Sequence, residues 1–177
     1  MADQFSVAKS YFCFVCLLGS LILGCQPQAN PSGMRVQVGR VVSGQTLELV
    51  NSGRQPETAK QVRLLGIEAP DLQQHPWGAA AQQRLAELIG DRPLRLEFDV
   101  NSEDRYQRLL GYVWLDNVLL NEQLVKEGYV LAGSQAPNIK YEQRLHRAQE
   151  RARLMGLGIW HPDQPMRQTP TEFRHQK

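Results

Sequence analysis

The chain has 177 residues, a length that suits one domain with an extension, and its hydrophobic fraction of 42% is enough for a real core. Its formal net charge of +2 does not by itself indicate a nucleic-acid-binding surface, because a nearly neutral, solvated surface is the commoner cause. All three cysteines, Cys13, Cys16 and Cys25, lie at the N-terminus. The body of the chain therefore has neither a disulfide nor a thiol nucleophile.

The N-terminal segment has the pattern of an export signal. Residues 11–24 form an apolar run behind Lys9, too short for the roughly 20 residues of a membrane-spanning helix but of signal-peptide length. The run ends in ILGC at residues 22–25, which resembles the cleavage site of bacterial lipoproteins. That resemblance implies a signal peptide at residues 1–24, lipidation of Cys25 and an exported protein anchored to a membrane, facing the periplasm or the exterior. An ordinary signal peptide or an uncleaved anchor is the alternative, and it also takes the domain out of the cytoplasm.

Residues 25–33 are polar and contain two prolines, which predicts a tether. Beyond it, apolar and polar residues alternate as in half-buried strands, and Ser43 and Gly44 supply a turn between the first two. The polar residues 51–59 are expected to form a loop. Strands are expected at residues 34–38, 46–49, 62–67, 94–98 and 109–115.

Pro76 opens a segment in which apolar residues recur with helical spacing, and Gly90 ends it. The same spacing predicts two more helices, at residues 120–127 and 141–155. Three strands, a helix, two strands and two helices fit an α+β fold, namely a five-stranded OB-type β-barrel packed against three helices. An α+β sandwich fits the same order of elements nearly as well.

The predicted domain covers residues 34–162, and residues 163–177 are expected to form a polar C-terminal tail. From residue 139 onward the chain has eight lysines and arginines against four acidic residues. We interpret this excess as the solvated face of the last helix and its tail rather than as a binding surface.

Two motifs indicate chemistry. VRLLGIEAPD at residues 62–71 is an apolar strand with Arg63 near its start and two carboxylates just past its end. An arginine in an apolar strand is costly unless an anion compensates its charge. DRYQR at residues 104–108 brings a second group of arginines after one helix and one strand. Arginines and paired carboxylates are the parts that hold a phosphodiester, a metal ion and an attacking water.

With these motifs in this order, the chain resembles the staphylococcal nuclease (thermonuclease-like) family over residues 38–160. The resemblance extends to Pro-Asn at residues 137–138 and to the ending GIW at residues 158–160. It implies the OB-type fold and a divalent-metal-dependent nuclease that hydrolyses phosphodiester bonds of DNA or RNA. As a lipoprotein-type, secreted member, such a protein would act at the cell surface on a single-stranded substrate, and we expect a monomer.

The resemblance also implies roles for individual residues. Arg63 and Arg108 would grip the scissile phosphate, for which the planar guanidinium is suited because it bonds two phosphate oxygens at once. Asp71 would activate the attacking water. Arg105 and Tyr106 would bind the substrate. Alternatively, the two arginines form surface salt bridges, Arg63 with Asp71 or Glu68, and Arg108 with Asp104.

The metal ion implied by the resemblance is calcium, held by Gln45, Glu68 and the backbone carbonyl of Ala69. Gln45 stands in SGQT, where the family has aspartate in DGDT, so a neutral amide replaces a charged ligand and the site should be weaker. Asp71 is one methylene shorter than the family's glutamate. Residues 132–136 contain no aromatic side chain where the family stacks tyrosines on the substrate.

These departures leave two other functions open. One is a catalytically weakened or inactive OB-fold lipoprotein that binds nucleic acid or phosphate. The other is a scaffold or interaction protein, which the versatility of OB barrels alone supports.

Overall fold

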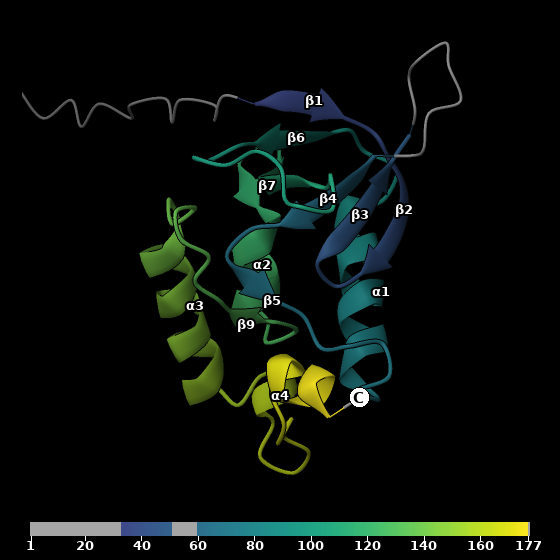
Figure 1. Ribbon diagram of the computed structural model, residues 1–177. Helices are drawn as coiled ribbons and strands as arrows, with labels where there is room; N and C mark the ends of the chain where they lie inside the picture. The colour runs from purple at the N-terminus through teal and green to yellow at the C-terminus, as the bar shows by residue number, and fades with distance from the viewer. Residues whose placement is uncertain (1–32, 51–59, 177) are drawn as a thin grey trace, which may run out of the picture.

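The computed structural model describes residues 33–50 and 60–176 (Figure 1). The predicted signal peptide, the lipidation site Cys25, nearly all of the tether and the predicted loop at residues 51–59 therefore lie outside the described residues. Within the described ranges, no helix has the length and apolarity needed to cross a membrane.

Most strands form one mixed sheet whose neighbours follow the order β1-β6-β7-β4-β3-β2, with β8 paired to β7. The pair β4–β7 is parallel, and the other pairs of this sheet are antiparallel. Its strands are β1 (Met34–Val36), β2 (Val38–Ser43), β3 (Thr46–Leu49), β4 (Gln61–Leu64), β6 (Leu94–Glu97), β7 (Leu109–Leu115) and β8 (Val118–Leu119). A separate two-stranded sheet pairs β5 (Ile67–Glu68) with β9 (Leu131–Ala132).

The helices lie around and below this sheet in Figure 1, with α1 and α3 on opposite sides and α4 at the end farthest from β1. Pro76 and Gly90 flank α1 as predicted, and the positive φ of Gly90 (54°) ends the helix. The helices are α1 (Trp77–Ile89), α2 (Leu120–Lys126), α3 (Glu142–Leu154), the short 3-10 turn η1 (Gly158–Trp160) and α4 (Pro170–His175).

A single apolar core joins the sheet to α1, α2 and α3, and all seven residues of β7 are buried. A buried carboxylate, Glu97, stands at its edge, where it accepts hydrogen bonds from Trp114 Nε1 (2.7 Å) and the Tyr141 hydroxyl (3.0 Å). Lys140 supplies the compensating positive charge. The core is formed by residues including Leu47, Leu64, Leu65, Leu85, Leu96, Tyr112, Leu124 and Leu145.

The predicted fold class, an α+β domain of the OB type, is confirmed, although among the described residues the main sheet has seven strands instead of the five expected. Two further differences in the elements bear on the site. The predicted strand at residues 62–67 divides into β4 and β5, because Gly66 turns the chain with a φ of 69°. A Cβ there would lie 2.5 Å from the Leu145 side chain, so the turn and the packing both require glycine. The second difference is α4, a fourth helix inside the segment expected to be a polar tail.

Candidate active site

Arg63 lies in β4 between β3 and β7, with Thr46 and Leu110 as its cross-strand partners. Its Nη2 donates to the carbonyl of Ile67 (3.3 Å), while Nη1 is buried and has no hydrogen-bond partner among the described residues. Burial and the neighbouring positive charges of Arg108 and Arg174 lower the pKa of Arg63 to about 10. The guanidinium remains charged at neutral pH, so the site has an unsatisfied cationic donor that an anion would stabilise.

Arg108 lies at the end of the loop before β7 and is held by Asp104. The Asp104 carboxylate accepts hydrogen bonds from Arg108 Nε (2.8 Å) and from the backbone N–H groups of Arg108 (3.0 Å) and Tyr106 (2.9 Å). Burial alone would raise the pKa of Asp104, but the bonds from Arg108 and Tyr106 outweigh it and lower that pKa. The salt bridge considered as an alternative for Arg108 is therefore present. It fixes the Arg108 side chain close enough to Arg63 to lower the pKa of Arg63.

Tyr106 is exposed (62%) and lies against two guanidinium groups. Arg105 Cζ is 4.8 Å from the centre of the tyrosine ring and Arg108 Cζ is 5.5 Å from it, both within cation–π range. Arg105 also donates a hydrogen bond to the tyrosine hydroxyl (2.6 Å). The loop thus presents two positive charges and an aromatic face together, which suits a nucleotide, and the substrate-binding roles of Arg105 and Tyr106 stay predictions.

Asp71 is half-buried in the loop that precedes α1, and hydrogen bonds fix its position. Its Oδ1 accepts from the backbone N–H of Gln73 (2.9 Å), and its own N–H donates to Gln74 Oε1 (3.0 Å). The backbone of Gly78 in α1 packs directly on Asp71, since a Cβ on Gly78 would lie 2.0 Å from the Asp71 carbonyl oxygen. The short side chain is therefore part of the loop structure, a role the sequence did not indicate.

The three predicted calcium ligands are neighbours, but protein groups already occupy two of their donor atoms. The amide oxygen of Gln45 accepts a hydrogen bond from the N–H of Ala69 (2.6 Å), and Oε1 of Glu68 accepts from Arg174 and Thr171. Within the described residues, no group of three or more His, Cys, Asp or Glu side chains could hold a metal ion. In this arrangement the donor set does not fit a resident divalent cation, and calcium at these residues stays a prediction.

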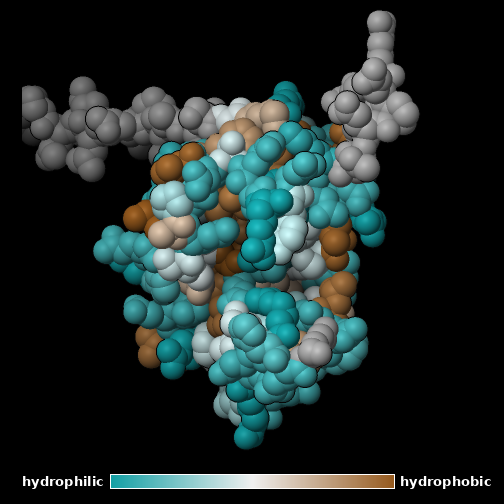
Figure 2. All heavy atoms as spheres, viewed as in Figure 1, coloured by the Kyte–Doolittle hydropathy of each residue, from teal (hydrophilic) through white to brown (hydrophobic). Residues whose placement is uncertain are grey.

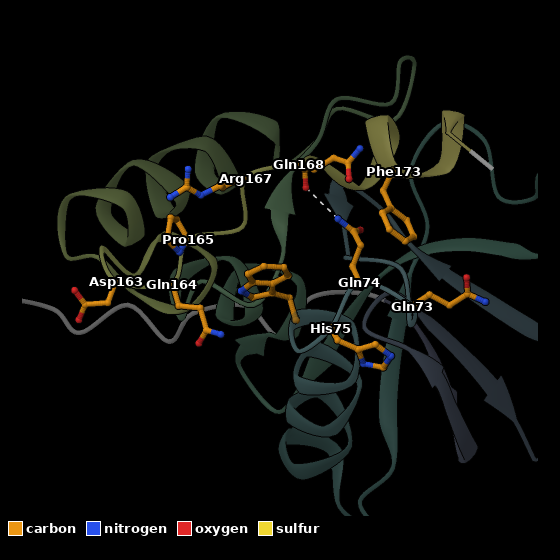
Figure 3. Close-up of a pocket in the computed structure, with 10 residues that line it drawn as sticks. Gln73, Gln74, His75, Asp163, Gln164, Pro165, Arg167, Gln168 and Phe173 are labelled. Carbon is orange, nitrogen blue, oxygen red and sulfur yellow. Dashed lines mark hydrogen bonds between the residues drawn. The ribbon is translucent and has the colours of Figure 1, made fainter.

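The contacts from α4 to Glu68 were missed at the level of sequence. The signal was TPTE at residues 169–172, in which Thr169 and Glu172 form a capping box, with Pro170 at the first helical position. The segment before α4 is also anchored: Gln74 Nε2 donates to the carbonyl of Gln168 (3.0 Å), the dashed bond in Figure 3. A cavity of about 410 Å³ lies between this segment and the loop before α1.

The site therefore combines two arginines at neighbouring strands, an aromatic loop and a carboxylate loop on an OB-type α+β domain. This combination is typical of a domain that binds anions. Residues 61–162 match the family model of the staphylococcal nuclease homologues. The chain belongs to the staphylococcal nuclease family, as its motifs predicted.

Individual relatives agree. The chain is 32% identical to the thermonuclease of Staphylococcus hyicus over 75% of its own length and 79% of the relative's. It is 34% identical to the thermonuclease of Staphylococcus intermedius, over 70% of this chain and 74% of the relative. The endonuclease YncB of Bacillus subtilis is 31% identical over 72% of this chain and 62% of the relative.

Proposed function

We propose that this chain is a nuclease, a phosphodiester hydrolase of the thermonuclease type. One observation supports it above the others: the charged guanidinium of Arg63 has a buried donor without a partner, next to Arg108. A phosphate oxygen is the acceptor that suits such a donor, because charge-assisted bonds from arginine to phosphate are strong and directional. The family membership supplies the reaction that acts on that phosphate.

In this proposal Arg63 and Arg108 bind the phosphate and stabilise the negative charge that grows as water attacks phosphorus. Donors of this type are worth about 10²–10³ in rate each in favourable cases. Asp71 accepts a proton from the water, the bond from phosphorus to the 5′ oxygen breaks, and that oxygen takes up a proton. The products end in 3′-phosphate and 5′-hydroxyl.

The remaining features of the proposal concern the setting of the reaction. We propose a single-stranded DNA or RNA substrate, a monomeric enzyme, and export to a membrane surface through lipidated Cys25. Dependence on calcium belongs to the proposal because of the family resemblance. The contacts of Glu68 with Arg174 and Thr171 mean that a cation would compete with α4 for this carboxylate.

The alternative, a binding module without chemistry, is favoured by specific contacts. Oδ1 of Asp71 is used to close its own loop, and Oε1 of Glu68 is bound to α4. Such a protein would hold nucleic acid or phosphate through the same arginines without cleaving it.

Incubation of the purified protein with single-stranded DNA and RNA, first with calcium and then with a chelator, tests the proposal. We expect cleavage with calcium, products that carry 3′-phosphate, and loss of cleavage in Arg63→Met. Arg151→Gln also removes one positive charge, at an exposed position of α3, and serves as the control. It should cleave like the wild type. Binding without cleavage under every condition would assign the chain to the binding module.

A further inference from the structure

Arg174 reaches the site from the last helix of the chain. Its guanidinium donates to Oε1 of Glu68 and to the hydroxyl of Thr171 (3.3 Å), and that hydroxyl donates to the same carboxylate oxygen. Glu68 directly follows Ile67, whose carbonyl accepts the hydrogen bond from Arg63. Two guanidinium groups, from β4 and from α4, are thus bound to adjacent residues of β5.

The local charges leave a surplus of positive charge. Arg108 and Arg174 lower the pKa of Arg63, and the carboxylates of Glu68 and Asp104 act in the opposite direction. Each of these carboxylates is matched by one arginine, Glu68 by Arg174 and Asp104 by Arg108. Arg63 remains as the unmatched charge, so an anion that bridges the three groups would complete the balance.

We propose that Arg174 is a third phosphate-binding residue of this site, bound to Glu68 where the family would place a metal ion. The proposal rests on the proposed function, because it assigns a further contact to the same phosphodiester. Because Arg174 already places a positive charge next to Glu68, we expect the phosphate to bind without a metal ion, whereas its cleavage keeps the calcium dependence proposed above.

The position of Arg174 is built into the fold. Pro170 is buried, the capping box of Thr169 and Glu172 defines the start of α4, and Gln168 is bound to the loop before α1. The Arg174 side chain is 41% exposed, so a ligand can reach it. Hydrophilic side chains cover α4 on the face that Figure 2 shows. Covering the core does not require a guanidinium next to Glu68, the predicted metal ligand, so the position of Arg174 suggests a contact with a ligand.

Calorimetry of the full chain with deoxyadenosine 3′,5′-bisphosphate, in a chelating buffer, tests this. We expect the wild type to bind, and Arg174→Gln to weaken binding by roughly 10- to 100-fold, the range of a charge-assisted hydrogen bond. Arg174→Lys should recover part of the affinity because it restores the charge without the planar fork. Arg151→Gln on α3 is the matched control for the lost charge and should not change the affinity.

Glu68→Gln separates a phosphate contact from a structural role. It frees Arg174 and removes a competing anion, so we expect tighter binding, the opposite of Arg174→Gln. If Arg174 only holds α4 in place, both variants would act alike or leave the affinity unchanged, and the inference would be wrong. Weak binding in Arg63→Met together with normal binding in Arg174→Gln would overturn this inference alone. No binding by the wild type in the chelating buffer would overturn this inference alone, and no binding in a repeat with calcium would overturn the proposed function as well.

Discussion

At the scale of single residues, the two arginines of the site differ in how their charges are compensated. Arg108 is fixed by Asp104 at 2.7 Å, so its charge is compensated before any ligand arrives. Arg63 has a buried nitrogen without a partner among the described residues, and its lowered pKa shows that the surroundings disfavour its charge. A residue that costs stability in the free protein and suits an anion is better explained by binding than by folding.

The two arginines should therefore differ when each is changed to methionine. Arg63→Met should leave the free energy of unfolding unchanged or raise it, because a poorly compensated buried charge is removed. Arg108→Met should lower it by about 1–3 kcal/mol, because Asp104 loses its charged partner. Both variants should bind a nucleotide bisphosphate more weakly. Urea unfolding and calorimetry measure the two quantities, and equal loss of stability in both variants would contradict the assignment for Arg63.

Asp104 gives the site a pH dependence with a definite sign. The folded-state pKa is lowered, so the carboxylate stabilises the fold fully above its ordinary pKa of about 3.9. That contribution is lost as the pH falls from there through the lower folded pKa. Asp104→Asn should reduce the free energy of unfolding by about 1–3 kcal/mol at pH 7, and the difference from the wild type should shrink in acid. A difference that stays constant between pH 7 and pH 2.5 would show that the charge is unimportant.

At the scale of elements, the site depends on how helices meet loops. The first turn of α1 approaches the Asp71 carbonyl so closely that only hydrogen fits at the Cα of Gly78. The capped α4 contacts Glu68 on β5. Asp71 is thereby positioned by the helix that directly follows its loop, and Glu68 by α4, which is distant in the sequence.

Gly78→Ala tests the contact between α1 and the Asp71 loop. Alanine usually favours a helix relative to glycine, by up to about 1 kcal/mol. Here the added methyl group must displace backbone atoms, and overpacking of this kind costs typically about 1–3 kcal/mol. We expect lower stability together with a fall in kcat, because Asp71 moves with the loop. Gly39→Ala is the control, since a Cβ there would make only ordinary contacts, 3.5 Å and longer.

The elements were more predictable from the sequence than their contacts. Alternation of apolar residues located β3 and β6, a continuous apolar run located β7, and the proline and glycine at its ends located α1. The strand at residues 62–67 was predicted as one piece because its apolar run is continuous, whereas the turn depends on the positive φ of Gly66, which packs against Leu145 of α3. The helix α4 was missed because six residues carry too little periodicity to be read.

The site was predictable as a set of residue types and not as a network. The position of Arg63 in a strand and of Arg108 in a loop followed from the motifs. The bond from Ala69 to Gln45 joins residues 24 positions apart, and the contact of Arg174 with Glu68 joins residues 106 apart. Contacts at such separations depend on packing, which no local pattern contains.

At the scale of the whole molecule, the predicted tether meets the domain at the end remote from α4. β1 begins the described chain at one end of the molecule in Figure 1, and α4 lies at the other. A lipid anchor ahead of β1 would therefore leave the α4 end of the site open to a long substrate.

The anchor itself can be tested on the protein. We expect membrane-extracted protein to begin at Cys25 with an acylated N-terminal peptide, because an apolar run of signal length ends in ILGC. Mass spectrometry of the N-terminal peptide is the measurement. Cys25→Ser should abolish the acylation and move the protein to the soluble fraction, whereas Cys16→Ser should not. A mature N-terminus elsewhere, with soluble behaviour, would contradict the lipoprotein prediction.

Changes at Gln45 and Asp71 decide whether the molecule acts as an enzyme or as a binding module. Gln45→Asp restores a ligand charge and should strengthen calcium binding, which calorimetry without nucleotide would measure. The gain should be larger when Arg174→Gln also releases Glu68. With calcium present, Asp71→Glu should raise the cleavage rate by restoring the reach to water, and Asp71→Asn should abolish cleavage while nucleotide binding remains.

Glu68→Asp combined with Asp71→Glu should raise the rate more than either change alone, because the two carboxylate lengths are exchanged along EAPD at residues 68–71. A rate measured with single-stranded DNA at saturating calcium makes the comparison, with Arg151→Gln as the unaffected control. The nuclease proposal fails if the wild type and these variants are all silent with calcium, manganese and magnesium. Retained bisphosphate binding in the same proteins would then establish a phosphate-binding module, since the arginines of β4, of the loop before β7 and of α4 would still hold the ligand.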